Sequence, residues 1–225
     1  MSDEKARRSA WRQPVFNVPP MVTALIAVNV AVHALRALLP ADTDDSLLNE
    51  LAFAPARFTE PGAFDWPALL SPVTYQFLHV GLAHLSINML FVLAVGTAVE
   101  RHIGAWRTLA FSLICGIAAA LTHLIVYPHD AAALVGFSGA ASGLFAGAFW
   151  LMSARRRRGR IGRLLMVSVL WIASNVLFGV WGLPPADSTP IAWVAHIGGY
   201  IAGLVLIPWF VPKRRDPSSR DEASS

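Results

Sequence analysis

The sequence predicts an all-α polytopic membrane protein, a bundle of six transmembrane helices with both termini in the cytoplasm. The 225-residue chain is 55% hydrophobic and 14% charged, whereas soluble domains carry about 25% charged residues. Its apolar residues fall in long runs, and about 20 such residues are enough for a helix to cross a bilayer. Basic residues gather in alternate connecting segments, as in membrane proteins of fixed orientation. We expect one membrane-embedded domain over residues 16–212.

The first apolar run, residues 16–39, follows a polar and basic segment, residues 1–15. The run is longer than the apolar region of a cleaved signal peptide, which is about 7–15 residues, and no convincing cleavage site is evident. We therefore expect a retained transmembrane helix, introduced by Pro19 and Pro20, with residues 1–15 in the cytoplasm.

A polar and acidic segment, residues 40–71, separates the first helix from the second, which is expected over residues 72–99. The segment predicts a long outer loop. Its aromatic residues suit a position on the membrane interface. They are Phe53, Phe58, Phe64 and Trp66.

Four further apolar runs predict the remaining helices, with short polar turns between them. The helices are expected over residues 106–127, 134–153, 164–181 and 191–210. The last residues, 213–225, are polar and predict a disordered cytoplasmic tail.

The distribution of positive charge predicts the orientation. All but two of the 18 Lys and Arg residues lie before the first helix, in or at the border of the second and fourth loops, or after the sixth helix; the exceptions are Arg36 and Arg57. The positive-inside rule puts these segments in the cytoplasm. The net charge of +4 is therefore explained without a nucleic-acid partner. The alternative for the arginine run at residues 155–163 is a specific lipid or nucleic-acid site. We expect a multi-pass protein of a bacterial-type plasma membrane.

The most distinctive motif surrounds Ser138. Small residues recur every fourth position after it, so a helix would present them as one smooth stripe that a second helix can approach closely. A matching stripe flanks His196. We expect the stripes to pack together and bring His196 within reach of Ser138. The first stripe consists of Gly139, Gly143 and Gly147, and the second of Ala195, Gly199 and Gly203.

These two residues suit acyl-transfer chemistry. A serine hydroxyl is a weak nucleophile that needs a neighbouring base, and an imidazole, whose ordinary pKa is close to neutral, can be that base. No Asp or Glu lies within the apolar cores, so a third member of a catalytic triad is not expected. The sequence predicts a Ser138–His196 dyad.

A second polar pair, His84 and Asn88, lies one helical turn apart on one face of the second helix. With Ser138 and His196, these residues fall in the outer half of a hydrocarbon core about 30 Å thick. Both side chains can donate hydrogen bonds, as can the backbone N–H of Ser138 near a helix N-terminus. Such donors are what a developing oxyanion requires.

Each feature alone has a structural explanation. A lone Ser in a membrane helix usually bonds a carbonyl one turn back, a lone His or Asn commonly links two helices, and glycine stripes indicate packing. The three polar motifs at matching depth favour catalysis instead, because polar residues at such depth are costly unless they are paired or hydrated.

Together, the motifs resemble the rhomboid family of intramembrane serine proteases, over residues 16–210. The resemblance implies cleavage of single-pass membrane proteins in or near their transmembrane segments, without a metal or cofactor. It implies Ser138 as nucleophile, His196 as general base, and His84, Asn88 and the Ser138 N–H as oxyanion stabilisers. It also implies substrate entry from the lipid, with the fifth helix and the following loop as a gate. The motifs are Gly136-Phe137-Ser138-Gly139, Ala195-His196-Ile197-Gly198-Gly199, the segment from His79 to Asn88, and Gly96 through Gly104.

Two positions depart from the family pattern. Many members have a Trp-Arg pair in the outer loop, where this chain has Leu70-Ser71. Many also have a Tyr one turn after the nucleophile, against the catalytic His, where this chain has Ser142. Ser142 lies on the same helix face as Ser138. We favour Ser138 as the nucleophile because it is nearer the helix start and follows a Gly-Phe pair.

Two other functions remain as alternatives. A catalytically inactive rhomboid-like protein could bind membrane clients, although retention of both Ser138 and His196 argues against it. A small transporter would be expected to carry charged or broken helices near the midplane, and neither is evident. The sequence also lacks the His-Glu-x-x-His motif of a metalloprotease. We expect transmembrane protein substrates and the lipid bilayer as partners; the oligomeric state stays open.

Overall fold

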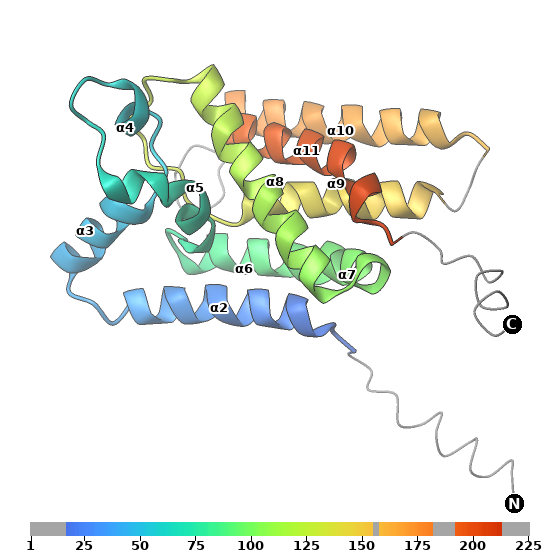
Figure 1. Cartoon of the computed structure of the whole chain (residues 1–225), viewed down its shortest axis with the longest axis horizontal. Helices are drawn as coiled ribbons and strands as arrows, with labels where there is room; N and C mark the ends of the chain where they lie inside the picture. The colour runs from blue at the N-terminus through green and yellow to red at the C-terminus, as the bar shows by residue number, and fades with distance from the viewer. Residues whose placement is uncertain (1–16, 155–157, 182–191, 213–225) are drawn as a thin grey trace, which may run out of the picture.

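The structure is a computed structural model that describes residues 17–154, 158–181 and 192–212, and these residues are mostly helical (Figure 1). The β-structure within these ranges is an isolated antiparallel bridge between Phe53 and Leu134. The all-α prediction is therefore confirmed for the described residues. The expected terminal segments, residues 1–15 and 213–225, lie outside them, as does the connection over residues 182–191.

Four helical stretches in the described ranges are long and apolar enough to cross a membrane. A shorter apolar helix, α2 (Pro20–Arg36), accompanies them, as does the 17-residue α9 (Ser138–Ala154). The four stretches are Leu82–Ile103, Ala105–Val126, Arg160–Leu177 and Trp193–Phe210.

Helix α9 occupies the centre of the bundle, packed against α8 (Ala105–Val126) and α11 (Trp193–Phe210). Glycines allow this packing. A Cβ added to Gly199 would overlap the carbonyl oxygen of Gly139 in α9, and one added to Gly203 would overlap that of Gly143. The backbones of α9 and α11 therefore touch, a proximity that larger residues would prevent.

The second transmembrane stretch begins later than the expected helix over residues 72–99. Residues in that range first form α5 (Ser71–Thr74) and a 3₁₀ turn, η2 (Tyr75–Phe77), and α6 (Leu82–Phe91) starts only after Gly81. The Tyr75 hydroxyl donates to the Gly116 carbonyl of α8 at 2.7 Å. This contact holds the early turns against α8, and the extended backbone of Gly81 separates them from α6.

Helix α6 then continues through a π-helical turn (Val92–Gly96) into α7 (Thr97–Ile103). Glu100 of α7 is buried and supports the start of α2. Its carboxylate accepts hydrogen bonds from the backbone N–H groups of Met21, at 3.0 Å, and Val22, at 2.8 Å. The first N–H groups of a helix have no partner within it. The residue before α2, Pro19, has no side-chain acceptor for them, so the Glu100 carboxylate caps this helix instead.

The outer loop forms a folded cap at one end of the bundle, on the left of Figure 1. It contains α3 (Ala41–Leu51), α4 (Ala56–Thr59) and the 3₁₀ turn η1 (Trp66–Leu69). Buried Arg36, at the end of α2, makes a two-pronged ion pair with Asp44 of α3, at 2.7 and 3.0 Å. Its third nitrogen donates to the carbonyl of His79, so one guanidinium fastens the loop to the bundle.

The aromatic residues of this loop divide into two groups. Phe53 is fully buried and packs against Phe58 and Tyr75, so its expected position on the membrane interface is wrong. Its backbone pairs with Leu134, which draws the side chain inward. Phe64 and Trp66, in contrast, are 51% and 79% exposed.

Helix α10 (Arg160–Trp181) runs along the edge of the bundle opposite α2 (Figure 1). Only 6% of its apolar span is buried, compared with 33–39% for the other three spans. Its main aromatic anchor is Trp171, whose ring packs against Phe145 and Tyr200. The Ser168 hydroxyl also lies 2.9 Å from the Tyr200 hydroxyl.

Candidate active site

Ser138 and His196 meet where α9 begins beside α11. The Oγ of Ser138 lies 2.8 Å from the Nε2 of His196. Ser138 is the first residue of α9, and His196 lies near the start of α11. The separation allows direct proton transfer from the hydroxyl to the imidazole.

The segment before α9 sets the position of Ser138. The backbone N–H of Gly136 donates to the Tyr75 carbonyl at 2.9 Å. Gly136 has a φ of 115°, which a residue with a side chain rarely adopts. A Cβ there would also lie 2.8 Å from the Cε1 of His84. Glycine at this position is thus required both by the backbone and by the neighbouring imidazole.

His84 and Asn88 line the same cavity as Ser138 and His196, which has a volume of about 640 Å³. The Asn88 amide nitrogen donates to the His84 carbonyl at 3.0 Å and carries a second hydrogen. The structure therefore brings together the four side chains singled out from sequence. The cavity extends towards α10 through Gly179 and towards the outer loops through Asp130.

Ser142 also lines this cavity, but its hydroxyl has a different partner. Its Oγ donates to the main-chain carbonyl of Ser138 at 2.8 Å, the usual arrangement of a serine inside a helix. The geometry favours Ser138 over Ser142 as the hydroxyl activated by His196.

Sequence reasoning missed a further polar side chain of the site, Asn175 of α10. Its Oδ1 lies 2.8 Å from the Nδ1 of His196, and the residue is 6% exposed. The sequence-based search considered only carboxylates as partners for the base, so it expected none. The signal in the sequence was an asparagine within the apolar run expected as the fifth helix, where a polar side chain is costly unless it has a partner.

Two further histidines lie close to the site. His123 lines the cavity, and its Nε2 is 3.2 Å from the carboxylate of Asp130. His79 is fully buried, with its ring packed edge-on against that of His84 at 5.1 Å between centroids. Burial, together with the nearby His84, lowers the pKa of His79 to about 3. His79 therefore stays neutral under mildly acidic conditions.

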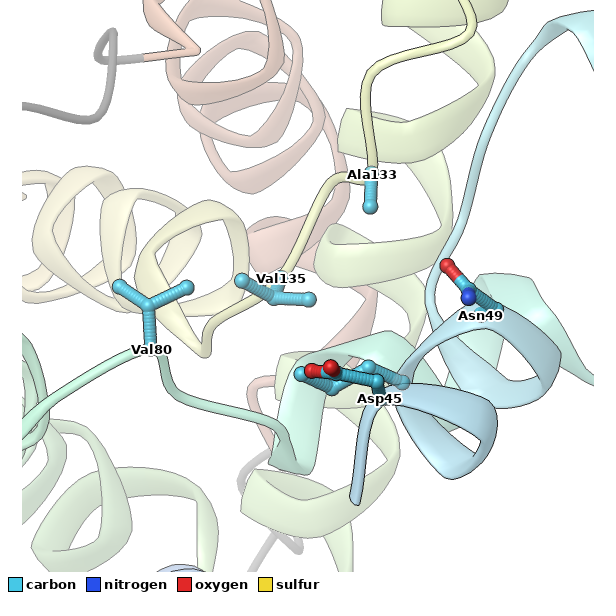
Figure 2. A pocket seen from close by; sticks show the side chains of 6 residues that line it. Asp45, Asn49, Val80, Ala133 and Val135 are labelled. Atoms are coloured by element: carbon cyan, nitrogen blue, oxygen red, sulfur yellow. The ribbon is translucent and has the colours of Figure 1, made fainter. Parts of the chain in front are cut away.

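A smaller hollow of about 300 Å³ adjoins the cavity beneath the outer loop (Figure 2). Asp45, Leu48 and Asn49 of α3 form one side of it. Val80, Ala133 and Val135 form the other side and also line the larger cavity. The outer loop thus contributes polar groups to a hollow that shares three lining residues with the cavity.

The described residues show no candidate metal centre. Within the described ranges, no group of three or more His, Cys, Asp or Glu residues could hold a metal ion. Cys115 is buried in α8, against Gly143 of α9.

Comparison with known proteins finds a match to the Rhomboid domain over residues 68–213. The chain is 29% identical over 188 residues to "Rhomboid protease GluP" of Bacillus subtilis, covering 83% of this chain and 34% of that protein. It is 26% identical to "Rhomboid protease GlpG" of Serratia proteamaculans, covering 84% and 62% of the two chains. It is also 26% identical to mouse "Rhomboid-related protein 2", covering 91% and 68%. The chain thus spans about a third of the first relative and three fifths of the second.

Proposed function

Because the chain belongs to the rhomboid family, we propose that it is an intramembrane serine endopeptidase that cleaves single-pass membrane proteins in or near their transmembrane segments. The observation that carries the proposal is the 2.8 Å approach of Ser138 Oγ to His196 Nε2 beside a cavity within the helical bundle. The printed names of two bacterial relatives, both rhomboid proteases, support the same reaction.

In the proposed mechanism Ser138 Oγ attacks the carbonyl carbon of the scissile peptide bond while His196 Nε2 takes the hydroxyl proton. The imidazolium then gives this proton to the departing amine, and the C–N bond breaks to leave an acyl-serine. A water molecule, deprotonated by His196, attacks the acyl group and releases the carboxyl product. Ser138 regains its proton in the last step.

His84, Asn88 and the backbone N–H of Ser138 are the proposed oxyanion stabilisers. The first two side chains line the cavity beside Ser138, and the amide of Asn88 has a hydrogen beyond the one given to the His84 carbonyl. Each donor aimed at the developing charge contributes about 3–4 kcal/mol to transition-state stability in comparable sites.

We further propose that the chain crosses a bacterial-type plasma membrane six times, with both termini in the cytoplasm. The distribution of Lys and Arg supports this orientation. Transmembrane substrates would enter sideways from the lipid, past the sparsely packed α10, which would act as the gate. The small residues of α9 and α11 keep the two site-bearing helices together.

The test is cleavage of a panel of tagged single-pass membrane proteins by the purified full-length chain. Ser138→Ala and His196→Ala should each lower cleavage by at least about a thousandfold, because each removes a partner in the nucleophile–base pair. The matched control is Ser142→Ala, which removes a hydroxyl one turn away and should retain most activity. The wild-type rate should also fall in acid, as protonation removes the acceptor at His196.

A fluorophosphonate probe, which reacts with activated serines, gives a substrate-independent readout. We expect it to label the wild type and Ser142→Ala but not Ser138→Ala. Loss of labelling in Ser142→Ala alone would move the nucleophile to Ser142. A folded wild type that neither cleaves nor labels would favour a client-binding protein instead.

A further inference from the structure

We propose that Asn175 is the positioning residue of the base, the side chain that holds His196 in the neutral tautomer able to accept the Ser138 proton. The catalytic consequence rests on the proposed protease function. The tautomer itself follows from the contacts of Asn175 and His196, and can be measured separately.

The contacts of Asn175 fix the direction of its amide group. Its Nδ2 donates to the main-chain carbonyl of Trp171 at 2.9 Å. A carbonyl oxygen can only accept, so the amide nitrogen must face Trp171. The amide oxygen, Oδ1, therefore faces the Nδ1 of His196 at 2.8 Å.

The orientation of the amide determines where the imidazole carries its hydrogen. An amide oxygen has no hydrogen to donate, so Nδ1 of His196 must be the donor. A neutral imidazole has one N–H, which leaves Nε2 with a lone pair. That lone pair faces the Oγ of Ser138 at 2.8 Å. The opposite tautomer would set two lone pairs against each other at Nδ1 and Oδ1.

The same hydrogen bond serves the protonated base. When Nε2 takes the Ser138 proton, the Nδ1–H bond to Oδ1 of Asn175 is retained, so the ring does not rotate away from the leaving group. A neutral amide supplies orientation but no negative charge. Asn175 should therefore affect the rate mainly through geometry and tautomer, whereas a carboxylate there would also favour the imidazolium.

Trp171, one turn before Asn175, fixes how α10 faces the site. Its ring centroid lies 4.6 Å from that of Phe145, 5.7 Å from Phe91 and 6.1 Å from Tyr200. These rings belong to α9, α6 and α11. These contacts hold Trp171 on the inner face of α10. Asn175, four residues later, lies on the same face and so contacts His196.

The experiment compares Asn175→Leu, which removes the acceptor at similar volume, with Asn175→Asp, which keeps an acceptor and adds charge. The matched control is Ser168→Ala, which removes another polar contact between α10 and α11 without touching His196. We would measure fluorophosphonate labelling rates across pH, and kcat and KM on a substrate cleaved by the wild type. In parallel, ¹⁵N NMR of histidine-labelled protein at about pH 8, with the His196→Ala spectrum for assignment, identifies the protonated ring nitrogen.

We expect the wild type and Ser168→Ala to show the Nδ1–H tautomer at His196, and Asn175→Leu to show a mixture. Asn175→Leu should lower kcat and the labelling rate by about ten- to a hundredfold, with little change in KM. Asn175→Asp should retain the rate in alkali, while the acid limb of its profile moves to higher pH.

Three results would overturn the inference: an Nε2–H tautomer in the wild type, a wild-type rate and tautomer in Asn175→Leu, or equal loss in Ser168→Ala and Asn175→Leu. The last would make Asn175 a docking contact only. Failure of the proposed protease function appears differently, as a wild type without labelling or cleavage. In that case the NMR comparison still decides the tautomer.

Discussion

At the scale of single residues, burial of His79 couples folding to pH. The folded chain binds a proton at this imidazole only near pH 3, whereas the reference pKa is 6.5. As pH falls from 6.5 towards 3, the unfolded chain takes up a proton that the folded chain excludes, so the free energy of unfolding decreases. The stabilising contribution of neutral His79 is thus present above pH 6.5 and lost in acid.

His79→Leu should therefore flatten this dependence. We predict a smaller decrease in melting temperature between neutral pH and about pH 4 than in the wild type, measured by thermal unfolding in detergent. His129→Gln is the control, because it removes a histidine whose ion pair with Glu60 lies at the surface, at 74% and 46% exposure, and surface ion pairs contribute little to stability. A slope for His79→Leu as steep as that of the wild type would contradict the prediction.

At the scale of elements, the start of α2 depends on a side chain from α7. Removing the Glu100 carboxylate leaves two backbone N–H groups without their acceptor, that of buried Val22 and that of half-buried Met21. We predict that Glu100→Ala lowers the free energy of unfolding by about 2–4 kcal/mol, measured by denaturant titration in mixed micelles.

The neighbouring exposed Arg101 provides the control for that experiment. Its side chain donates to the Asn17 carbonyl, and Arg101→Ala should cost less than about 1 kcal/mol. Equal losses in the two variants would mean that α2 is held by general packing against α7 rather than by the carboxylate cap.

At the scale of the whole molecule, the arrangement of charges predicts opposite accessibility of the two ends of the bundle. In a Cys115→Ser background, Ala63→Cys in the outer loop should react with a membrane-impermeant maleimide in intact cells. Arg158→Cys, near the arginine run, should react only after the membrane is opened. Both positions are exposed in the structure. The reverse pattern of labelling would invert the proposed topology.

Hydropathy was sufficient to predict a helical membrane protein, because a chain in lipid must satisfy its backbone hydrogen bonds within each segment. Glycine spacing likewise predicted close packing beside Ser138, and the structure has Gly199 against Gly139. Both features appear as local patterns in the sequence, namely long apolar runs and small residues at every fourth position. They can therefore be predicted without knowing which distant segments are in contact.

The remaining features depend on contacts between distant segments. The break before α6 depends on Tyr75 reaching Gly116 of α8, and the burial of Phe53 on its pairing with Leu134. The contact of Asn175 with His196 depends on the rotation of α10 about its axis, which is set by rings from three other helices. Hydrophobic periodicity in one segment carries none of this information.

If Asn175 sets the tautomer of His196 as proposed, its position on the edge helix would make the base responsive to the surrounding membrane. Linkage is reciprocal: a ligand that moved Asn175 away from His196 would disfavour the proposed Nδ1–H tautomer, and a ligand that bound this tautomer would favour the packed position of α10 by the same factor. Because only 6% of its span is buried, α10 would present most of its surface to lipid in the proposed membrane orientation. An apolar molecule bound between α10 and the rest of the bundle would then be expected to slow the proposed reaction without approaching Ser138.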